Sequence, residues 1–279
     1  MRASARQWRR RRTPARDAYL ALLERYAAGD ADGAATGALA LDIQSTQRLA
    51  RAVSETESAA KPERVRRRKL IVRVHTEAGL RKAAPQPQLL IAGDEVDRLW
   101  KGAGDDADLR LFVRDWYLLV VSQFATLGQL QSLKAHIHEG LSRFKDDPEL
   151  LLARGTLHEQ MAESTNVDRS LLTRIYTPAM AARWRLDLYD ARADYARAER
   201  APAARAEARL RWGRVQGLLG DTDSAMPALA EASASDAPPY LRYLAHLFRA
   251  ELLEQADEPA AAGDAYESAL RLWPRANAP

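Results

Sequence analysis

Small and large side chains recur at helical spacing in the second half of the chain, and this pattern predicts the fold. Three segments carry a small residue, a large residue four positions later and a second small residue three positions after that. The three trios are Ala191, Tyr195 and Ala198; Ala225, Leu229 and Ala232; and Ala262, Tyr266 and Ala269. Offsets of four and three place each trio on one helix face, where the small residues let a neighbouring helix approach and the large one fills the gap.

The trios recur at a nearly constant spacing, 34 residues from Ala191 to Ala225 and 37 residues from Ala225 to Ala262. Each of the later two trios follows a turn and another amphipathic segment, with breaks at Gly220-Asp221 and at Asp257-Glu258-Pro259. One helical hairpin cannot bury its apolar face alone, whereas a stack of hairpins makes a continuous core. Because β-branched residues rarely alternate with polar ones, strands have little support.

The same register continues toward the N-terminus. A further trio there consists of Leu133, Ile137 and Gly140. Gly155 occupies the small-residue position in the first helix of the next unit, but the trio that should follow begins only at Ala191. We therefore expect an insertion near residues 163–178, between the two helices of that unit. Insertions in solenoids usually lie on one face, often the binding face.

The order of small and large residues resembles that of the tetratricopeptide repeat family. The residues closest to the family pattern are Leu210-Arg211-Trp212-Gly213, Leu219-Gly220, Ala225 and Ala232. The chain departs from it at Gln216, where a tyrosine is usual, and at Pro227, because a proline is tolerated only in the first turn of a helix. The resemblance covers residues 111–274 and implies an all-α fold, a right-handed α-solenoid of antiparallel helix hairpins.

Outside the repeats the sequence predicts less regular structure. We expect residues 1–16 to be a disordered basic leader, and residues 17–110 to form an N-terminal helical region with one hairpin-like unit plus irregular helices. The boundary with the repeats of 111–274 is expected at the Gly102–Asp106 loop, and residues 275–279 form a tail.

In the resembled family the first helices of the hairpins line a concave groove, which implies a protein or peptide partner. The residues that the register places on this face, and that we expect to be exposed, are Ser122, Thr126, Thr156, Glu159, Gln160, Arg211, Arg214, Glu251 and Glu254. Their mixed charges do not form a carboxylate clamp. For each of them a solvated helix face is the plainer alternative.

Charge raises an alternative function. Seven arginines and no acidic residue occur in residues 1–16, and Arg64–Lys69 is a second basic cluster, while the net charge of the whole chain is only +4. These clusters could contact phosphates, which would make the chain a nucleic-acid-associated regulatory protein with salt-sensitive affinity. A disordered basic end is the simpler interpretation of the leader.

The sequence carries none of the common catalytic motifs. The chain has no Gly-rich phosphate loop and no nucleophile elbow, and His75-Thr76-Glu77 lacks the second histidine of a metalloprotease motif. A structural role is therefore expected for His75. There is no cysteine, and His136 and His138 diverge on a helix, so we expect no metal and no cofactor. The predicted function is a non-catalytic interaction or assembly scaffold.

No signal-peptide core follows the basic start, and no apolar run approaches the roughly 20 residues of a membrane helix. The sequence thus favours a soluble cytoplasmic protein. A periplasmic location stays open if the start site is misassigned.

Overall fold

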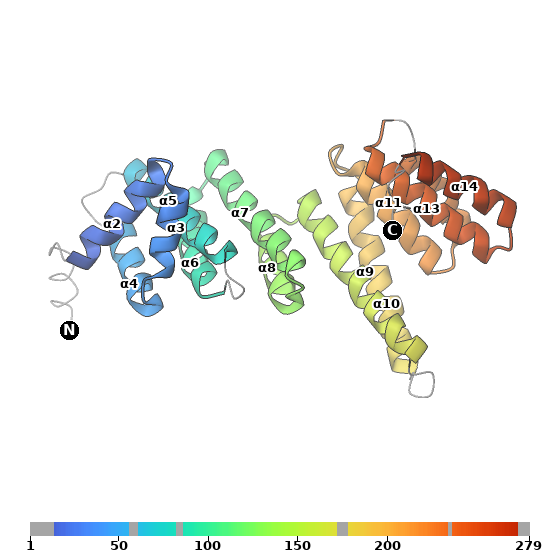
Figure 1. The fold of residues 1–279 in the computed structure, drawn as a ribbon, viewed down its shortest axis with the longest axis horizontal. Coiled ribbons are helices and arrows are strands. Elements are labelled where there is room, and N and C mark those ends of the chain that lie inside the picture. The colour runs from blue at the N-terminus through green and yellow to red at the C-terminus, as the bar shows by residue number, and fades with distance from the viewer. Residues whose placement is uncertain (1–13, 56–60, 82–85, 172–177, 234–235, 273–279) are drawn as a thin grey trace. The chain divides into compact units, whose positions relative to one another are not determined.

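The computed structural model describes residues 14–55, 61–81, 86–171, 178–233 and 236–272. These residues contain thirteen α-helices, α2 to α14, and no strand (Figure 1), so the all-α prediction is confirmed. Neighbouring helices pack against one another as in a helical repeat. The right-handed sense of the solenoid stays a prediction. The chain divides into two compact units, residues 1–123 and residues 124–279.

The first unit consists of helices of unequal length. They are α2 (Pro14–Ala27), α3 (Ala31–Leu39), α4 (Ile43–Ser54), α5 (Lys61–Leu80), α6 (Gln86–Ala103) and most of α7 (Ala107–Thr126). Aspartates cap the N-termini of α3 and α4. The Asp30 side chain accepts a hydrogen bond from the Gly33 amide, and the Asp42 side chain accepts one from the Ser45 amide, both at 2.8 Å. Most of the expected leader, residues 1–13, lies outside the described residues, and Pro14–Arg16 begin α2.

The loop expected to divide the chain separates α6 from α7. In α7, Trp116 is buried and its indole Nε1 donates a 2.8 Å hydrogen bond to the hydroxyl of Thr76 on α5. Because α7 packs back onto α5 in this way, the division between the compact units falls after Gln123 rather than in Gly102–Asp106.

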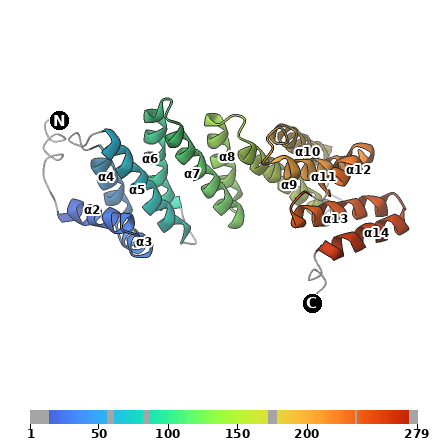
Figure 2. The same cartoon turned by 90° about the horizontal axis from the view of Figure 1, so that it is seen from above.

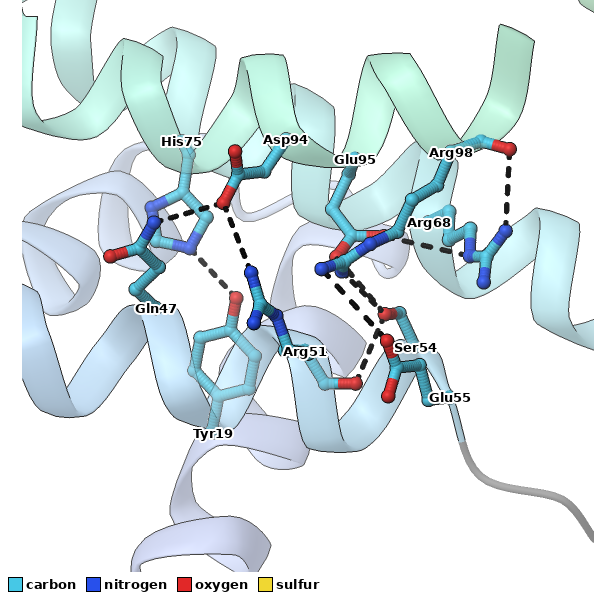
Figure 3. A network of polar contacts seen from close by, with 10 residues as sticks. All are labelled: Tyr19, Gln47, Arg51, Ser54, Glu55, Arg68, His75, Asp94, Glu95 and Arg98. Atoms are coloured by element: carbon cyan, nitrogen blue, oxygen red, sulfur yellow. Dashed lines mark hydrogen bonds and ion pairs between the residues drawn. The ribbon is translucent and has the colours of Figure 1, made fainter. Parts of the chain in front are cut away.

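Polar side chains form a buried network inside the first unit (Figure 3). The Tyr19 hydroxyl lies 2.7 Å from His75 Nε2, as Figure 3 shows. His75 Nδ1 lies 2.7 Å from Gln88 Oε1. Since Gln88 Oε1 can only accept, Nδ1 carries the proton and Nε2 accepts from the tyrosine. Burial lowers the pKa of His75 from its usual 6.5 to about 4, which keeps the ring neutral. The structural role expected for His75 agrees with this placement.

A second group of polar contacts surrounds a buried carboxylate on α6. Glu95 accepts a 3.0 Å hydrogen bond from the Ser54 hydroxyl, pairs with Arg98 and lies 3.5 Å from Arg68. Burial raises the pKa of Glu95, and the two arginines oppose that rise. The contacts tie α4, α5 and α6 together, as Figure 3 shows.

The second unit consists of α8, which packs against α9, followed by three successive helix pairs. Its helices are α8 (Leu130–Arg143), α9 (Pro148–Leu171), α10 (Pro178–Ala198), α11 (Arg205–Leu218), α12 (Thr222–Ala232), α13 (Pro239–Gln255) and α14 (Pro259–Leu272). Helices α9 and α10, α11 and α12, and α13 and α14 pack as pairs (Figure 2). The trios lie where the periodicity placed them, and Ala191, Tyr195 and Ala198 are completely buried.

Glycines let the helices come close at two of these contacts. A Cβ atom on Gly155 of α9 would lie 2.5 Å from the Tyr195 ring of α10, and one on Gly217 of α11 would lie 2.7 Å from Leu252 of α13. Both distances are too short for real atoms, so the interhelical spacing depends on the missing side chain. The tight packing that the small residues predicted is therefore present both within one pair and between pairs.

The insertion expected near residues 163–178 is largely helical. Helix α9 has 24 residues and continues to Leu171, and α10 has 21 residues and begins at Pro178, whereas α11 has 14. The additional residues lengthen both partners of one pair. Residues 172–177 of the expected insertion, and the tail at 275–279, lie outside the described residues.

Pro227 differs from expectation. Helix α12 begins at Thr222, so Pro227 lies in its second turn, where a proline interrupts the hydrogen-bond ladder. Its missing N–H leaves the Asp223 carbonyl without a helical partner, and both residues are exposed to water, which limits the cost. Across the parts of the chain that the structure describes, no helix combines the length and apolar character needed to cross a membrane.

Candidate functional site

The first helices of three successive pairs, α9, α11 and α13, carry most of the residues expected to bind a partner. They supply Thr156, Glu159, Gln160, Arg211, Arg214, Glu251 and Glu254. The structure brings a subset of these together around one carboxylate. We call the group formed by Glu159, Glu163, Tyr195, Arg211 and Arg214 the acid–arginine cluster.

Glu159 lies at the centre of the acid–arginine cluster. Its Oε2 accepts a 2.8 Å hydrogen bond from the Tyr195 hydroxyl, and its Oε1 pairs with the Arg214 guanidinium. Arg211 lies 3.7 Å from Glu159 Oε2. Two guanidinium groups and a phenol therefore satisfy one carboxylate, which is the condition for burying a charge without a large cost.

The two arginines have acidic partners nearer to solvent as well. Arg214 also pairs with Glu163, and Arg211 donates from Nε to Glu207 at 2.9 Å. Burial and the neighbouring Glu159 raise the pKa of the Tyr195 phenol well above its usual value, so this phenol stays protonated and remains a donor. The guanidinium planes are thus held in position from two sides.

Arg214 extends the cluster to α13. Its guanidinium carbon lies 4.7 Å from the centroid of the Phe248 ring, a cation–π distance. Burial raises the pKa of Glu251, Arg214 opposes that rise, and Glu254 adds to it. Side chains from α9, α11 and α13 consequently form one continuous surface.

The expectation that Glu159 is exposed is wrong, because only 3% of its side chain is accessible. Arg211 and Arg214 of the next pair cover it. Thr156 and both arginines are half-buried, whereas Gln160, Glu251 and Glu254 are exposed, and Glu254 accepts a 3.0 Å hydrogen bond from Tyr266. Their roles in binding stay predictions.

Ser122 and Thr126 lie near the end of α7 and both are exposed. Ser122 belongs to the first compact unit and Thr126 to the second. They are not members of the acid–arginine cluster, and their role in binding also stays a prediction. Sequence reasoning missed Glu163 and Phe248, although Glu163 follows Glu159 by one helical turn and shares its face.

Three groups near one another could in principle ligate a metal ion. One atom each from His158, Asp187 and Asp190 lies within 4.8 Å of the others. However, the buried Asp187 carboxylate already accepts from Arg183 Nε at 3.1 Å and lies 3.4 Å from His158 Nδ1. The guanidinium supplies the positive charge that a cation would bring, so the contacts favour an ion-pair group over a metal site.

The Arg64–Lys69 cluster on α5 is partly committed to internal pairs. Arg66 and Arg67 lie 3.6 and 2.9 Å from Glu63, and Arg68 reaches the buried Glu95. These contacts reduce the positive charge available to a nucleic acid strand. The basic leader, residues 1–16, was expected to contact phosphates together with this cluster, and it lies almost wholly outside the described residues.

Comparison with protein-family models gives no match for this chain. Comparison with curated proteins gives no significant match. The tetratricopeptide resemblance therefore rests on the residue pattern, and the functional argument rests on the site itself.

Proposed function

We propose that the second unit is a non-catalytic protein-interaction module of the tetratricopeptide type, which binds an extended peptide or a helix along α9, α11 and α13. One observation carries the proposal: Glu159 of α9 pairs with Arg214 of α11, and Arg214 lies over Phe248 of α13. Three consecutive first helices thereby present a single surface. In helical repeats such a surface is the usual place for a partner.

The chemistry of the surface suits a protein partner. Tyr240, at the start of α13, is 48% exposed, and its pKa is raised by its partial burial and by Glu207, the acid that Arg211 binds. Tyrosine and arginine are enriched where proteins bind one another. Because the acid–arginine cluster already orders Arg211 and Arg214, binding costs less side-chain entropy.

Charge reversal at exposed positions of this surface tests the proposal. The full-length chain is used as bait for affinity purification and mass spectrometry, and Glu251→Lys/Glu254→Lys is compared with Asp264→Lys/Glu267→Lys, a pair of exposed acids on α14. We expect the first variant to lose the co-purifying proteins and the second to keep them. Matching circular-dichroism spectra exclude unfolding as the cause.

Two outcomes would contradict the proposal. If both variants retained the same partners, the surface on α9, α11 and α13 would not be the binding site. If the wild-type chain recovered no protein above a bait-free control, a binding role for this unit would lose its support.

A further inference from the structure

The first unit contains a pocket of about 650 Å³ whose lining is strongly basic. Four cationic residues contribute to it, namely Lys61, Arg66, Lys69 and Arg73. Among the described residues that line it, the acidic one is Asp106. The Asp106 carboxylate also accepts a 2.9 Å hydrogen bond from the Leu109 amide at the start of α7, so it is partly engaged.

The cations are gathered by the geometry of one helix. Arg66, Lys69 and Arg73 follow one another along α5 at spacings of three and four, which places them on one face. Like charges at these spacings repel each other, so the arrangement is unfavourable by itself. An anion between them would remove that repulsion.

Three of the four cations have no recorded carboxylate partner in the part of the chain that the structure describes. Within the described ranges, no carboxylate is recorded at ion-pair distance from Lys61, Lys69 or Arg73, and only Arg66 has such a partner, Glu63 at 3.6 Å. Lys69 and Arg73 instead share the ring of one residue of α7, Phe112, at 5.1 and 5.6 Å from its centroid. The ring positions both charges beside the pocket and leaves their hydrogen-bond donors available.

Several cations elsewhere in this unit are paired with carboxylates. Arg25 pairs with Asp30 at 2.6 Å, Arg81 pairs with Glu77 at 2.8 Å, and Arg98 pairs with the buried Glu95. Among the described residues these arginines are committed to carboxylates, whereas no such partner is recorded for Lys61, Lys69 or Arg73.

The remaining lining indicates the size and character of a ligand. The rest of the wall is mostly apolar and is formed by Tyr26, Ala27, Pro62, Val65 and Leu70. The volume lies within the range of small-molecule sites and exceeds what inorganic phosphate fills. We propose that this pocket binds a nucleotide-sized small molecule that carries at least two phosphate charges, with its ring portion against the apolar wall.

The placement of the charges favours a compact ligand over a nucleic acid strand. Arg67 and Arg68 could extend the row of positive charges along α5, but they form ion pairs with Glu63 and Glu95. A strand needs a series of phosphate contacts, whereas this pocket concentrates its cations at one point.

Isothermal titration calorimetry on the full-length protein at low salt tests the proposal, with ATP and inorganic pyrophosphate as probes. Lys69→Gln/Arg73→Gln removes two of the pocket's charges, and the control Arg48→Gln/Lys101→Gln removes two exposed charges on α4 and α6. We expect saturable binding of ATP to the wild type, tighter than that of pyrophosphate. The pocket variant should bind at least about ten-fold more weakly and the control within about two-fold, because only the former removes charge-assisted hydrogen bonds. Thermal unfolding of each variant without ligand shows that both still fold.

Three results would overturn the proposal. The first is no saturable binding of ATP or pyrophosphate by the wild type. The second is equal weakening by the pocket variant and the control, which would indicate diffuse surface charge. The third is binding of a single-stranded oligonucleotide without binding of ATP, which would replace the compact ligand by a polynucleotide. None of these results bears on partner binding by the second unit, because the pocket residues all lie in the first.

Discussion

The hydroxyl of Tyr195 donates a 2.8 Å hydrogen bond to the buried carboxylate of Glu159, and the ring of the same tyrosine closes over Gly155 one turn earlier on α9. One side chain therefore fills the contact between α9 and α10 and also orients the carboxylate that Arg211 and Arg214 bind. The packing of the repeat and the charge pattern of its surface depend on the same residue.

Removal of the charge of Glu159 should destabilise the second unit. Glu159→Gln leaves Arg211 and Arg214 facing a neutral amide in a half-buried site, and we expect a loss of about 3 kcal/mol of unfolding free energy. Urea denaturation followed by circular dichroism measures it. The control Glu251→Gln, at an exposed position, should stay within about 0.5 kcal/mol. Similar losses in both variants would show that the acid–arginine cluster is not a specific source of stability.

Two glycine-to-alanine changes should act in opposite directions. Gly155→Ala places a methyl group against the Tyr195 ring and should cost about 2 kcal/mol through overpacking. Gly263 lies on the exposed face of α14, where an added Cβ would meet no neighbouring side chain within 4 Å, so Gly263→Ala should stabilise the protein by up to about 1 kcal/mol. Differential scanning calorimetry should record a lower Tm for the first variant and a higher Tm for the second. A neutral Gly155→Ala would mean that α9 and α10 can separate at little cost.

Acid should weaken the first unit through His75. The pKa of this histidine is about 4 in the folded protein and 6.5 when it is unperturbed, so its contribution is fully present above pH 6.5 and is lost as the pH falls toward 4. Between pH 7.5 and pH 5 the loss should be about 2 kcal/mol. Guanidinium denaturation at the two pH values, on the wild type and on His75→Gln, checks this. The variant has no such group to titrate, and an equally steep pH dependence in both proteins would count against a neutral buried His75.

The proline inside α12 should limit stability. Pro227→Ala restores a donor to the Asp223 carbonyl in an exposed second turn and should stabilise the protein by about 1 kcal/mol or more. Pro239 is the first residue of α13, where its missing N–H has no helical partner to lose, so Pro239→Ala should bring no gain. Thermal melts of the two variants side by side distinguish these effects. Equal shifts in Tm would indicate that helix position does not matter here.

The sequence predicted the second unit better than the first. The positions of Ala191, Tyr195 and Ala198 follow from helical periodicity alone, because local spacing determines which residues share a face. The same register placed Glu159, Arg211 and Arg214 on one surface. It could not show that Glu159 is buried, because the arginines that cover it lie about 50 residues further along the chain.

Less of the first unit could be predicted, because its sequence has no repeated spacing that indicates which helices contact each other. His75 was expected to be structural, but its partners Tyr19 and Gln88 lie 56 and 13 residues away, and no spacing rule links them. The division after Gln123 could not be predicted from the sequence either. It falls inside the continuous helix α7, whereas the glycine-rich loop that suggested a boundary precedes this helix. Pairing between irregular helices is a tertiary property that periodicity does not encode.

Helices α9 and α10 gain their extra residues together, at the end where the chain turns from one to the other, while Gly155 and Tyr195 meet near the opposite end. Growth by matched helical turns therefore leaves the junction with α11 undisturbed. Whole turns can therefore be added to or removed from both helices by design, and each turn changes the length of the pair by about 5 Å.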